Sequence, residues 1–266
     1  MSESNKKVCL TIAGLDPSGG AGVIADIKAF TAFGCFASAA VTSITYQNTT
    51  GVFGAEAQSA DTVASQINPI FNDYSVAAVK SGMLPTSEVI DRLAAIISEN
   101  SVENFVVDPV VRSTSGFDLI DNAALRVLID RLFPLATVIT PNIPEAERIS
   151  GVAIQSYEDI VAAAEVMRDL GAKDILIKGG HRIEGERKGS RAIDYLFSGG
   201  EVVEFVAPFV ETKGTHGTGC VLSAAITANL AIGKPLKQAI DIAKKYVSNA
   251  IAEPNYLGRG FHPVNI

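Results

Sequence analysis

The sequence predicts an α/β protein with a central, mostly parallel sheet that is covered by helices on both faces. Short β-branched runs alternate with segments of helical periodicity along the whole 266-residue chain, and this alternation is typical of parallel sheets. The chain contains no long linker rich in proline, serine or glycine, and no internal repeat. We therefore expect a single domain that spans residues 1–266.

The first half of the chain opens with a strand and a helix whose patterns are clear. Residues 8–13 form an apolar run, and a helix is predicted at 20–33. Its buried side is expected to carry Val23, Ile24, Ile27 and Phe30. Further strands are predicted at 39–45, 51–56, 77–80 and 104–108, and further helices at 61–71, 87–99 and 122–133.

The second half continues this order and adds an antiparallel hairpin. Ser156 is a suitable N-cap for one of its helices. Gly199 and Gly200 supply the positive φ that a tight hairpin turn needs. Strands are predicted at 137–140, 174–178, 191–197 and 201–206, and helices at 156–170, 218–231 and 236–252.

Composition and charge exclude several classes of function. The net charge of −7 provides no basic face for nucleic acid and no polybasic anchor for a membrane. The apolar segment 8–13 is too short for a signal peptide or a membrane span, so we expect a cytoplasmic protein. The three cysteines lack a CxxC pair and the three histidines lack HExxH or HxH spacing, so neither a disulfide framework nor a zinc or histidine metal site is predicted.

Segment 212–220 indicates chemistry more directly than any other part of the sequence. Gly217 and Gly219 allow a tight turn and a close approach to a ligand, and the helix predicted from Thr218 directs unpaired N–H groups at it. Phosphate is the expected ligand of such a helix N-terminus. Cys220 follows in the first helical turn, where the helix dipole favours its thiolate. We therefore expect a lowered thiol pKa and a proton acceptor beside a phosphate cradle.

The glycine-rich turn 13–22 after the first strand is a second candidate. Gly20, Gly22 and Ala25 satisfy the GxGxxA pattern of dinucleotide-binding proteins, but the glycines lie several residues past the strand and no acidic residue ends the next strand. A substrate loop is the better interpretation. Asp26 lies four residues after Gly22, where it would accept hydrogen bonds from a ligand. The alternative is a surface aspartate near a helix N-terminus.

Two more strand ends carry side chains that suit a flat heterocycle. Gln47 offers two donors and an acceptor, which complement an amino-substituted ring nitrogen edge. Met83 would form an adaptable apolar wall. The alternatives are an ordinary loop amide and a core methionine. Ligands of open α/β sheets sit outside the carboxyl ends of the strands, so these candidates would share one edge of the sheet.

Carboxylates and a lysine follow the remaining strands. Asp108 stands at one strand end, and Asn142 and Glu145 follow another. Such oxygen ligands suit Mg²⁺, which binds through one or two carboxylates together with waters and phosphate oxygens. Glu145 equally suits the first turn of a helix. Lys178 would reach a phosphate, whereas the absence of GxxxxGK[ST] disfavours a P-loop protein.

Taken together, these segments resemble the hydroxymethylpyrimidine/phosphomethylpyrimidine kinases of thiamin synthesis, within the ribokinase-like family. The resemblance covers nearly the full length and implies a three-layer α/β/α fold with a small flap or edge hairpin. It also implies phosphorylation of 4-amino-5-hydroxymethyl-2-methylpyrimidine, and then of its monophosphate, by ATP with Mg²⁺. The segments that carry it are, in family order, 11–22, 47–49, 82–84, 108–110, 140–145, 178–181 and 215–220.

The resemblance also implies roles for single residues. Cys220 matches the general base, and the N–H groups from Gly217 to Cys220 would hold the charge on the transferred phosphoryl group. The residues expected around the pyrimidine are Gly14, Asp26, Gln47, Met83 and Val110. Those expected near Mg²⁺ and phosphate are Asp108, Asn142 and Glu145, and those on the nucleotide side are Lys178, Thr212, Lys213, His216 and Thr218.

Two other functions stay open at this point. A pyridoxal kinase would share the cradle and the cysteine, although similar pyridoxal kinases have an apolar residue in place of Gln47. A non-catalytic nucleotide or pyrimidine sensor would keep the same fold. The family suggests a homodimer. The charged loop 182–188 is either a solvated surface loop or a mobile flap over the site.

Overall fold

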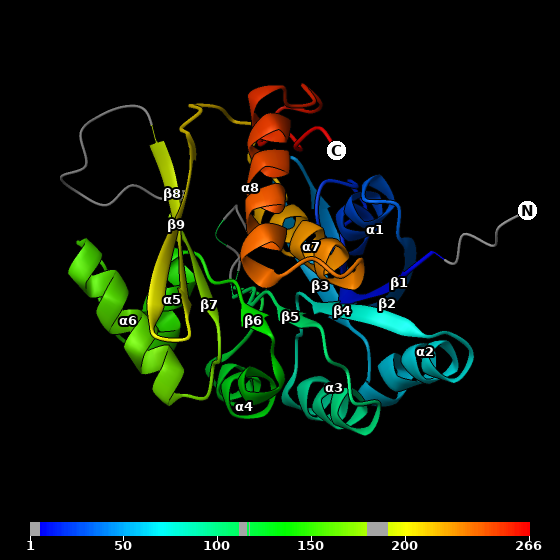
Figure 1. Cartoon of the computed structure of the whole chain (residues 1–266). Coiled ribbons are helices and arrows are strands. Elements are labelled where there is room, and N and C mark those ends of the chain that lie inside the picture. The colour runs from blue at the N-terminus through cyan, green and yellow to red at the C-terminus, as the bar shows by residue number, and fades with distance from the viewer. Residues whose placement is uncertain (1–5, 112–115, 117, 180–190) are drawn as a thin grey trace, which may run out of the picture.

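The computed structural model describes residues 6–111, 116, 118–179 and 191–266. Within these residues the strands form a nine-stranded sheet of order β3-β2-β1-β4-β5-β6-β7-β8-β9 (Figure 1). Strands β2, β1, β4, β5, β6 and β7 are parallel, and β3, β8 and β9 pair antiparallel to their neighbours. The strands are β1 (Val8–Leu15), β2 (Phe36–Asn48), β3 (Gly51–Ala57), β4 (Val76–Ser81), β5 (Phe105–Val107), β6 (Val138–Ile139), β7 (Ile175–Gly179), β8 (Arg191–Ser198) and β9 (Glu201–Pro208).

Helices cover both faces of the sheet and form the predicted α/β/α layers (Figure 1). A core that includes Leu10 and Ile12 lies under α2 (Ala60–Asp73), α3 (Ser87–Glu99), α4 (Asn122–Leu132), α5 (Ile143–Ser150) and α6 (Tyr157–Asp169), with a 3₁₀ turn at Phe133–Leu135. A second core that includes Cys9 and Val106 lies under α1 (Gly22–Ala32), α7 (Thr218–Ala231) and α8 (Leu236–Ala252). Because successive residues of a strand face opposite sides, the doubly covered β1 is buried without alternation from Cys9 to Gly14.

Helix α7 holds the phosphate cradle in a fixed place. Every residue from Val221 to Ala231 is buried, and the helix packs between α1, α8 and the sheet. A helix that is apolar on all sides is typical of a position inside the protein. The N-terminus of α7 is therefore anchored by the core and not by surface contacts.

Most predicted elements agree with the structure, with differences at their ends. The predicted helices at 87–99, 218–231 and 236–252 match α3, α7 and α8. Strands β1 and β2 extend past the predicted ends to Leu15 and Asn48, because β1 continues to pair with β2 and β2 with β3 beyond the predicted ends. Helix α5 was absent from the predicted elements, although the alternative that placed Glu145 in the first turn of a helix is confirmed. Its capping residue Asn142 and Pro144 in its first turn explain why a helix begins there.

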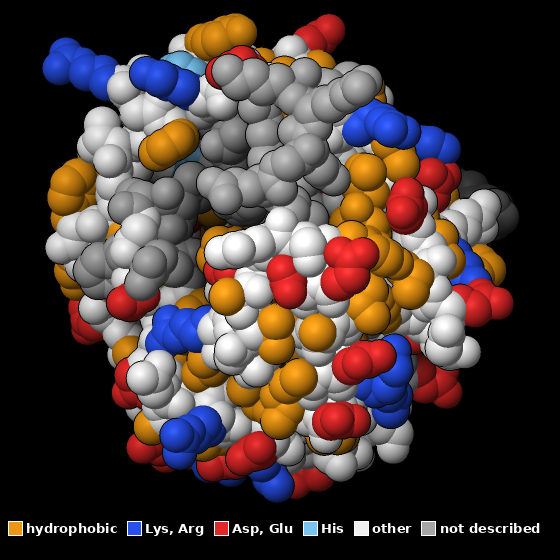
Figure 2. Space-filling view, turned by 90° about the vertical axis from the view of Figure 1, so that its left-hand side faces the viewer, with side chains coloured by type: hydrophobic (Ala, Val, Ile, Leu, Met, Phe, Trp, Pro, Cys, Tyr) orange, Lys and Arg blue, Asp and Glu red, His pale blue; other side chains and the backbone are white. Residues whose placement is uncertain are grey.

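The hairpin of β8 and β9 is confirmed. Ser198 pairs with Glu201 across Gly199 and Gly200, whose φ angles are 58° and 84°. The charged loop 182–188 and His181 lie outside the described residues. Figure 2 shows the side of the molecule on which this hairpin and α6 lie, where acidic and basic side chains are interspersed with exposed apolar ones. Of the described helices, none is long and apolar enough to cross a membrane.

The sheet order places a ligand crevice beside β1. Strand β1 lies between β2 and β4, so the chain leaves β1 toward one side of the sheet and returns on the other. Such a reversal opens a crevice outside the carboxyl ends of the strands. Those ends bring together the turn 14–22 after β1, Lys80 at the end of β4 and Asp108 just after β5.

Candidate active site

A cavity of about 1030 Å³ lies at these strand ends. The turn after β1, the end of β2 and the ends of β4, β5 and β7 form its floor and sides. The N-terminus of α7 and one side of α8 complete it. Among the residues with predicted roles, the cavity is lined by Gly14, Gln47, Met83, Asp108, Val110, Asn142, Glu145, Lys178, Thr212, His216, Gly217, Thr218, Gly219 and Cys220.

The phosphate cradle has the predicted backbone form. Gly217 is the N-cap of α7 with φ 85° in the left-handed region, which favours glycine. Its Cβ would collide with the Gly20 carbonyl, so the cradle also requires glycine for close packing against the turn after β1. A Cβ at Gly219 would lie 3.2 Å from Lys178 Nζ. Glycine at 219 therefore leaves the ammonium group uncovered at the N-terminus of α7.

An ion-pair cluster lies beneath the cradle. Lys178 Nζ is 3.0 Å from Asp108 Oδ1 and 3.8 Å from Glu145 Oε2. Thr140 Oγ1 donates to Asp108 Oδ1 at 3.2 Å, and Ser223 Oγ donates to Asp108 Oδ2 at 3.1 Å. The cluster thus joins β5, β7, α5 and α7 at the centre of the cavity.

The two carboxylates of this cluster have opposite pKa shifts. Burial alone would raise the pKa of Asp108, but Lys178 and Lys80 lower it, so this carboxylate is ionised. Burial raises the pKa of Glu145 to about 7, although Lys178 opposes the shift. For Lys178, burial would lower the pKa, and Asp108 and Glu145 raise it instead. The lysine is therefore a fixed positive charge beside the cradle.

The residues predicted around Mg²⁺ fit that ion in part. The carboxylates of Asp108 and Glu145 converge on one cationic group, and hard oxygen donors of this kind suit Mg²⁺. The side chain of Asn142 has a different partner, because its Oδ1 accepts from the Glu145 N–H at 2.9 Å in a capping box. No group of three or more His, Cys, Asp or Glu side chains with metal-binding geometry occurs among the described residues.

Cys220 lies in the cavity wall, but its thiol does not have the predicted pKa. Burial raises the pKa of the Cys220 thiol to about 11, although Lys80 and the Gly22 N–H act in the opposite direction. The argument from the helix dipole predicted a lowered pKa for this thiol and was wrong. Desolvation of a thiolate outweighs the helix terminus here. At neutral pH the side chain is a thiol.

One end of the cavity is shaped for a flat ring. Gly14 and Met83 are in contact, since a Cβ on Gly14 would lie 3.0 Å from Met83 Sδ. Gln47 lies in β2 at the pairing with Val52, and both residues line the cavity. Val110, just after β5, completes this group. A single heterocyclic ring would lie between these apolar surfaces, with the Gln47 amide at its edge.

Asp26 does not line the cavity, contrary to the prediction. It is fully buried in α1, and Lys80 Nζ donates to its two carboxylate oxygens at 3.0 and 2.8 Å. Thr11 Oγ1 donates to the same carboxylate at 2.6 Å. The side chain points toward the sheet, where a buried carboxylate needs a cation. Lys80, which does line the cavity, is a residue to which the sequence analysis gave no role.

His216 and Lys213 were both expected on the nucleotide side of the site, and of the two only His216 lines the cavity. His216 lines the cavity, but its Nε2 lies 2.8 Å from Oδ2 of Asp16 in the turn after β1. Lys213 is exposed and its side chain does not line the cavity. Its carbonyl accepts from the His262 N–H at 2.8 Å, so the backbone of this residue is the part that has a structural role.

Asp16 is a second residue that sequence reasoning missed. It is 1% exposed and accepts from the N–H of Ser18 at 2.8 Å and from the N–H of Ala21 at 2.9 Å. An aspartate two residues before a serine in a glycine-rich turn is a typical signal for such bonds. The contact to His216, 200 residues later, has no such local signal.

Comparison with known proteins gives a consistent result. A family model described as phosphomethylpyrimidine kinase matches residues 16–265. The thiamine biosynthesis bifunctional protein ThiED of Geobacter sulfurreducens is 45% identical over 96% of this chain, which spans 51% of that protein. The hydroxymethylpyrimidine/phosphomethylpyrimidine kinase of Staphylococcus aureus is 43% identical over 97% of this chain and 93% of that protein. This chain therefore spans about half of the bifunctional relative and most of the kinase.

Two solved structures share the fold over most of their length. A phosphomethylpyrimidine kinase from Clostridium difficile is 39% identical with a TM-score of 0.80, over 92% of this chain and 100% of that chain. A pyridoxal kinase from Bacillus subtilis, solved as an ADP complex, is 36% identical with a TM-score of 0.87, over 97% of this chain and 96% of that chain. Both relatives are named as kinases of small heterocycles.

Proposed function

The chain belongs to the phosphomethylpyrimidine kinase family of ATP-dependent kinases in thiamine biosynthesis, and we propose that it phosphorylates 4-amino-5-hydroxymethyl-2-methylpyrimidine. The proposal extends to the resulting monophosphate, which receives a second phosphate. The observation that carries it is that one cavity is lined by the apolar residues Met83 and Val110, by the glycines of the anion cradle and by Cys220.

The apolar end would hold the pyrimidine ring. Met83 and Val110 would contact the ring faces, and Gly14 permits the close approach of Met83. The amide of Gln47 would pair with the amino group and ring nitrogen of the substrate, since it carries both donors and an acceptor. This arrangement would point the hydroxymethyl group toward the N-terminus of α7.

Cys220 would accept the proton of the hydroxymethyl group as it attacks phosphorus. Its sulfur receives a hydrogen bond from the Gly22 N–H and lies within the field of Lys80, and both lower the energy of the thiolate. Because the pKa of the thiol is about 11, the thiolate is its minor form at neutral pH, and this thiolate would be the form that takes the hydroxymethyl proton and becomes a thiol. Transfer of the proton during attack then leaves the alkoxide character on the substrate oxygen.

The cradle would stabilise the transferred phosphoryl group. The N–H groups at the N-terminus of α7 would bind the phosphoryl oxygens. Lys178 would add a positive charge, since its Nζ is 3.2 Å from the position that a Cβ on Gly219 would take. In phosphoryl transfer, positioning and charge stabilisation supply most of the catalysis. When bound with ATP, Mg²⁺ would be held by the carboxylates of Asp108 and Glu145 and would neutralise charge on the phosphate oxygens.

Several further properties are part of this proposal. The nucleotide would extend from the cradle along Thr212 and Thr218 toward α8, whose residues line that end of the cavity. We also propose a single domain over residues 1–266, a cytoplasmic location, and a homodimer, as the family resemblance implies.

A coupled assay of ADP release tests the proposed function. Hydroxymethylpyrimidine, its monophosphate and pyridoxal are each offered with ATP to the wild-type protein. The proposal expects the highest kcat/KM for the two pyrimidines. A higher kcat/KM for pyridoxal would instead support the pyridoxal kinase alternative, which the similarity to the Bacillus subtilis structure favours. If none of the three compounds causes ADP release, both the proposed function and the pyridoxal kinase alternative are contradicted.

The variant Gln47→Leu sharpens this test. It keeps the size of the side chain and removes the amide that reads the pyrimidine edge. Loss of such a hydrogen bond in a closed site costs about 1–3 kcal/mol, or roughly fivefold to 160-fold in kcat/KM for the pyrimidine. Pyridoxal turnover should change less, because the ring of pyridoxal has no amino group at this edge.

A further inference from the structure

The edge of the sheet forms one wall of the cavity, at the end that is shaped for a flat ring. Strand β3 is the outermost strand on this side and pairs with β2. Gln47 of β2 and Val52 of β3 both line the cavity, and they pair with each other. The proposed function uses the amide of Gln47 and gives no role to Val52. Val52 thus lies directly beside the amide that would read the substrate.

The side chains of β2 alternate between the cavity and solvent in this region. Thr45 is buried and lines the cavity, whereas Ile44 and Tyr46 are exposed. Because successive residues of a strand point to opposite faces of the sheet, Gln47 falls on the same face as Thr45. Thr45 Oγ1 donates to the Leu15 carbonyl at 2.8 Å, and this bond ties the cavity face of β2 to the end of β1. The position of Gln47 is therefore fixed by the regular course of β2.

A β-bulge interrupts the regular course of β3 at the same place. Tyr46 pairs with Gly54, and the next pair is Gln47 with Val52. Phe53 is therefore an extra residue with no pairing partner on β2. Residues directly opposite each other in an antiparallel pair share one face of the sheet, with Cβ atoms about 4.5–5.5 Å apart. Without the register shift, Phe53 would be opposite Gln47 and would face the cavity.

The bulge leaves Phe53 in solvent and puts Val52 in the cavity wall. Phe53 is 69% exposed and does not line the cavity, whereas Val52 is partly buried and does. Contacts on the outer face of the sheet hold this register. The Tyr46 ring packs over Gly54, where a Cβ would lie 3.0 Å from a ring carbon. The Tyr46 hydroxyl donates to Glu56 Oε2 at 3.0 Å, one strand across.

The residue opposite Gln47 decides how much room lies beside the ring edge that the amide would read. In the pyrimidine, that edge has a bare ring nitrogen between the amino group and the methyl group. Pyridoxal has a carbon with a hydroxyl group in place of this nitrogen, and a formyl group in place of the amino group. It therefore needs more room at the same edge. A valine leaves space for the smaller edge, and a phenylalanine would fill that space.

We propose that Val52 is a specificity-determining residue that limits the size of the ring edge beside Gln47. The β-bulge at Phe53 supports this role, because it puts the smaller of two adjacent apolar side chains in the cavity wall. The inference rests on the proposed function, which sets the orientation of the ring. Val52 would contact the ring and not the reacting hydroxymethyl group, so changes at this position should alter KM more than kcat.

The first experiment compares two alanine variants at adjacent positions. The kcat/KM of hydroxymethylpyrimidine and of pyridoxal is measured for wild type, Val52→Ala and Phe53→Ala. A difference of one methylene in an apolar pocket changes kcat/KM by about tenfold or more. We therefore expect Val52→Ala to raise the ratio of pyridoxal to pyrimidine kcat/KM by about tenfold. Phe53→Ala is the matched control and should keep the wild-type ratio, because its side chain lies outside the cavity.

The second experiment exchanges the two side chains without a change in composition. Val52→Phe/Phe53→Val puts a phenylalanine opposite Gln47 and a valine in solvent. Both residue types favour strands, and thermal unfolding checks that the variant is folded. Overfilling of a packed site should raise the KM of hydroxymethylpyrimidine by about fivefold or more, with kcat changed less. If Phe53 were the residue that faces the cavity, the exchange would enlarge the site and would not raise this KM.

Calorimetric titration with hydroxymethylpyrimidine alone separates this inference from the proposed function. If wild type binds the pyrimidine without ADP release in the kinase assay, the proposed function is rejected, and weaker binding by the exchanged variant would still uphold the role of Val52. If wild type is an active kinase, the inference is overturned by a wild-type KM in the folded exchanged variant. A substrate ratio that is unchanged in Val52→Ala, or that changes as much in Phe53→Ala, would overturn it as well. Failure of wild type to bind the pyrimidine would reject both.

Discussion

Nε2 of His216 lies 2.8 Å from Oδ2 of Asp16, and this contact joins the glycine-rich turn after β1 to the phosphate cradle before α7. Two glycines make the approach possible. Gly20 packs against the His216 ring, and Gly217 packs against the Gly20 carbonyl. Segments from the two ends of the chain therefore form one wall of the cavity. The substrate end and the phosphate end of the site cannot shift independently without breaking this contact.

Replacement of Asp16 should destabilise the protein in a manner that depends on pH. Burial would raise the pKa of Asp16, but hydrogen bonds from His216 and Ser18 lower it below its ordinary value. A lowered pKa means that the ionised carboxylate stabilises the folded state. This contribution is fully present above the unfolded pKa of about 3.9 and is lost as the pH falls through the folded pKa.

Asp16→Asn should therefore be less stable than wild type at about pH 7, and the difference should narrow below about pH 4. Urea denaturation at several pH values measures it. Asp61→Asn is a suitable control, because the Asp61 side chain is 85% exposed and should contribute little at any pH. If the difference in unfolding free energy between Asp16→Asn and wild type stays constant or grows as the pH falls, ionisation of Asp16 is not what stabilises the turn.

Gly217 and Gly233 lie at the two ends of α7. A comparison of alanine variants at these positions distinguishes the cost of backbone strain from the cost of lost close packing. Gly217 and Gly233 have nearly the same φ, 85° and 86°, but nothing lies within 4 Å of a Cβ on Gly233. Gly233→Ala should cost about 1–2 kcal/mol in unfolding free energy, the usual cost of this backbone region. Gly217→Ala adds the collision with Gly20 and should also raise the KM of ATP. Equal stability and equal KM in the two variants would mean that the cradle is not packed as described.

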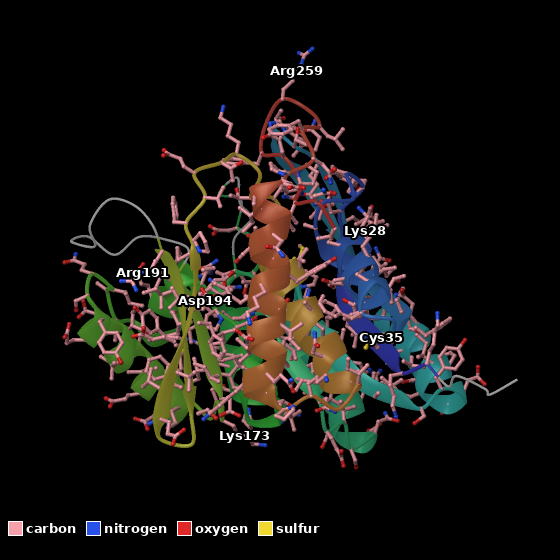
Figure 3. The ribbon with its side chains drawn as sticks, turned by 45° about the horizontal axis from the view of Figure 1, so that its top comes forward. Lys28, Cys35, Lys173, Arg191, Asp194 and Arg259 are labelled. Carbon is pink, nitrogen blue, oxygen red and sulfur yellow. The ribbon has the colours of Figure 1, made fainter. Side chains whose placement is uncertain are left out.

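The outer end of the cavity contains another buried ion pair. Lys244 of α8 lies 2.8 Å from Asp194 of β8, with side chains that are 11% and 4% exposed. Asp194, which Figure 3 labels beside α8, also accepts from the Gly179 N–H. The pair thus connects α8 to β8, where Asp194 lies opposite Lys178 of β7.

Loss of this pair should be costly. Lys244→Met leaves the Asp194 charge buried and should lower the unfolding free energy by about 3–5 kcal/mol. Lys237→Met breaks a surface pair with Glu201, whose side chains are 51% and 70% exposed, and should cost less than about 1 kcal/mol. Thermal or urea denaturation compares them. Similar losses in the two variants would show that water reaches the Lys244 pair.

Local patterns in the sequence were sufficient for much of this structure. The helix that follows Gly217 and the hairpin at Gly199 were predictable because glycine and periodicity act over a few residues. Strand ends were less predictable. Strand β2 continues to Asn48 because the backbone of β3 pairs with its polar residues. A prediction from side-chain composition ends the strand where the apolar pattern stops.

Relationships over long distances in the chain could not be predicted in the same way. Asp26 and Lys80 are 54 residues apart, and nothing local indicates that each is the counter-charge of the other. The pKa of Cys220 shows the same limit. A helix N-terminus favours a thiolate, but the depth of burial that opposes it depends on the packing of α1 against α7. Gly14 and Met83 were correctly expected to share a cavity, because they lie at the carboxyl ends of the neighbouring strands β1 and β4.

The turnover of hydroxymethylpyrimidine by Cys220→Ala tests the central claim most directly. The account predicts a fall in kcat of about 10²- to 10⁴-fold, the usual contribution of a general base. Wild-type kcat should rise between about pH 7 and pH 9, because a thiol with a pKa of about 11 loses its proton as the pH rises, and Cys220→Ala should lack this rise. Cys35→Ala, at a buried thiol beyond the far end of α1 (Figure 3), should retain wild-type kcat. A kcat near wild type in folded Cys220→Ala would contradict the account.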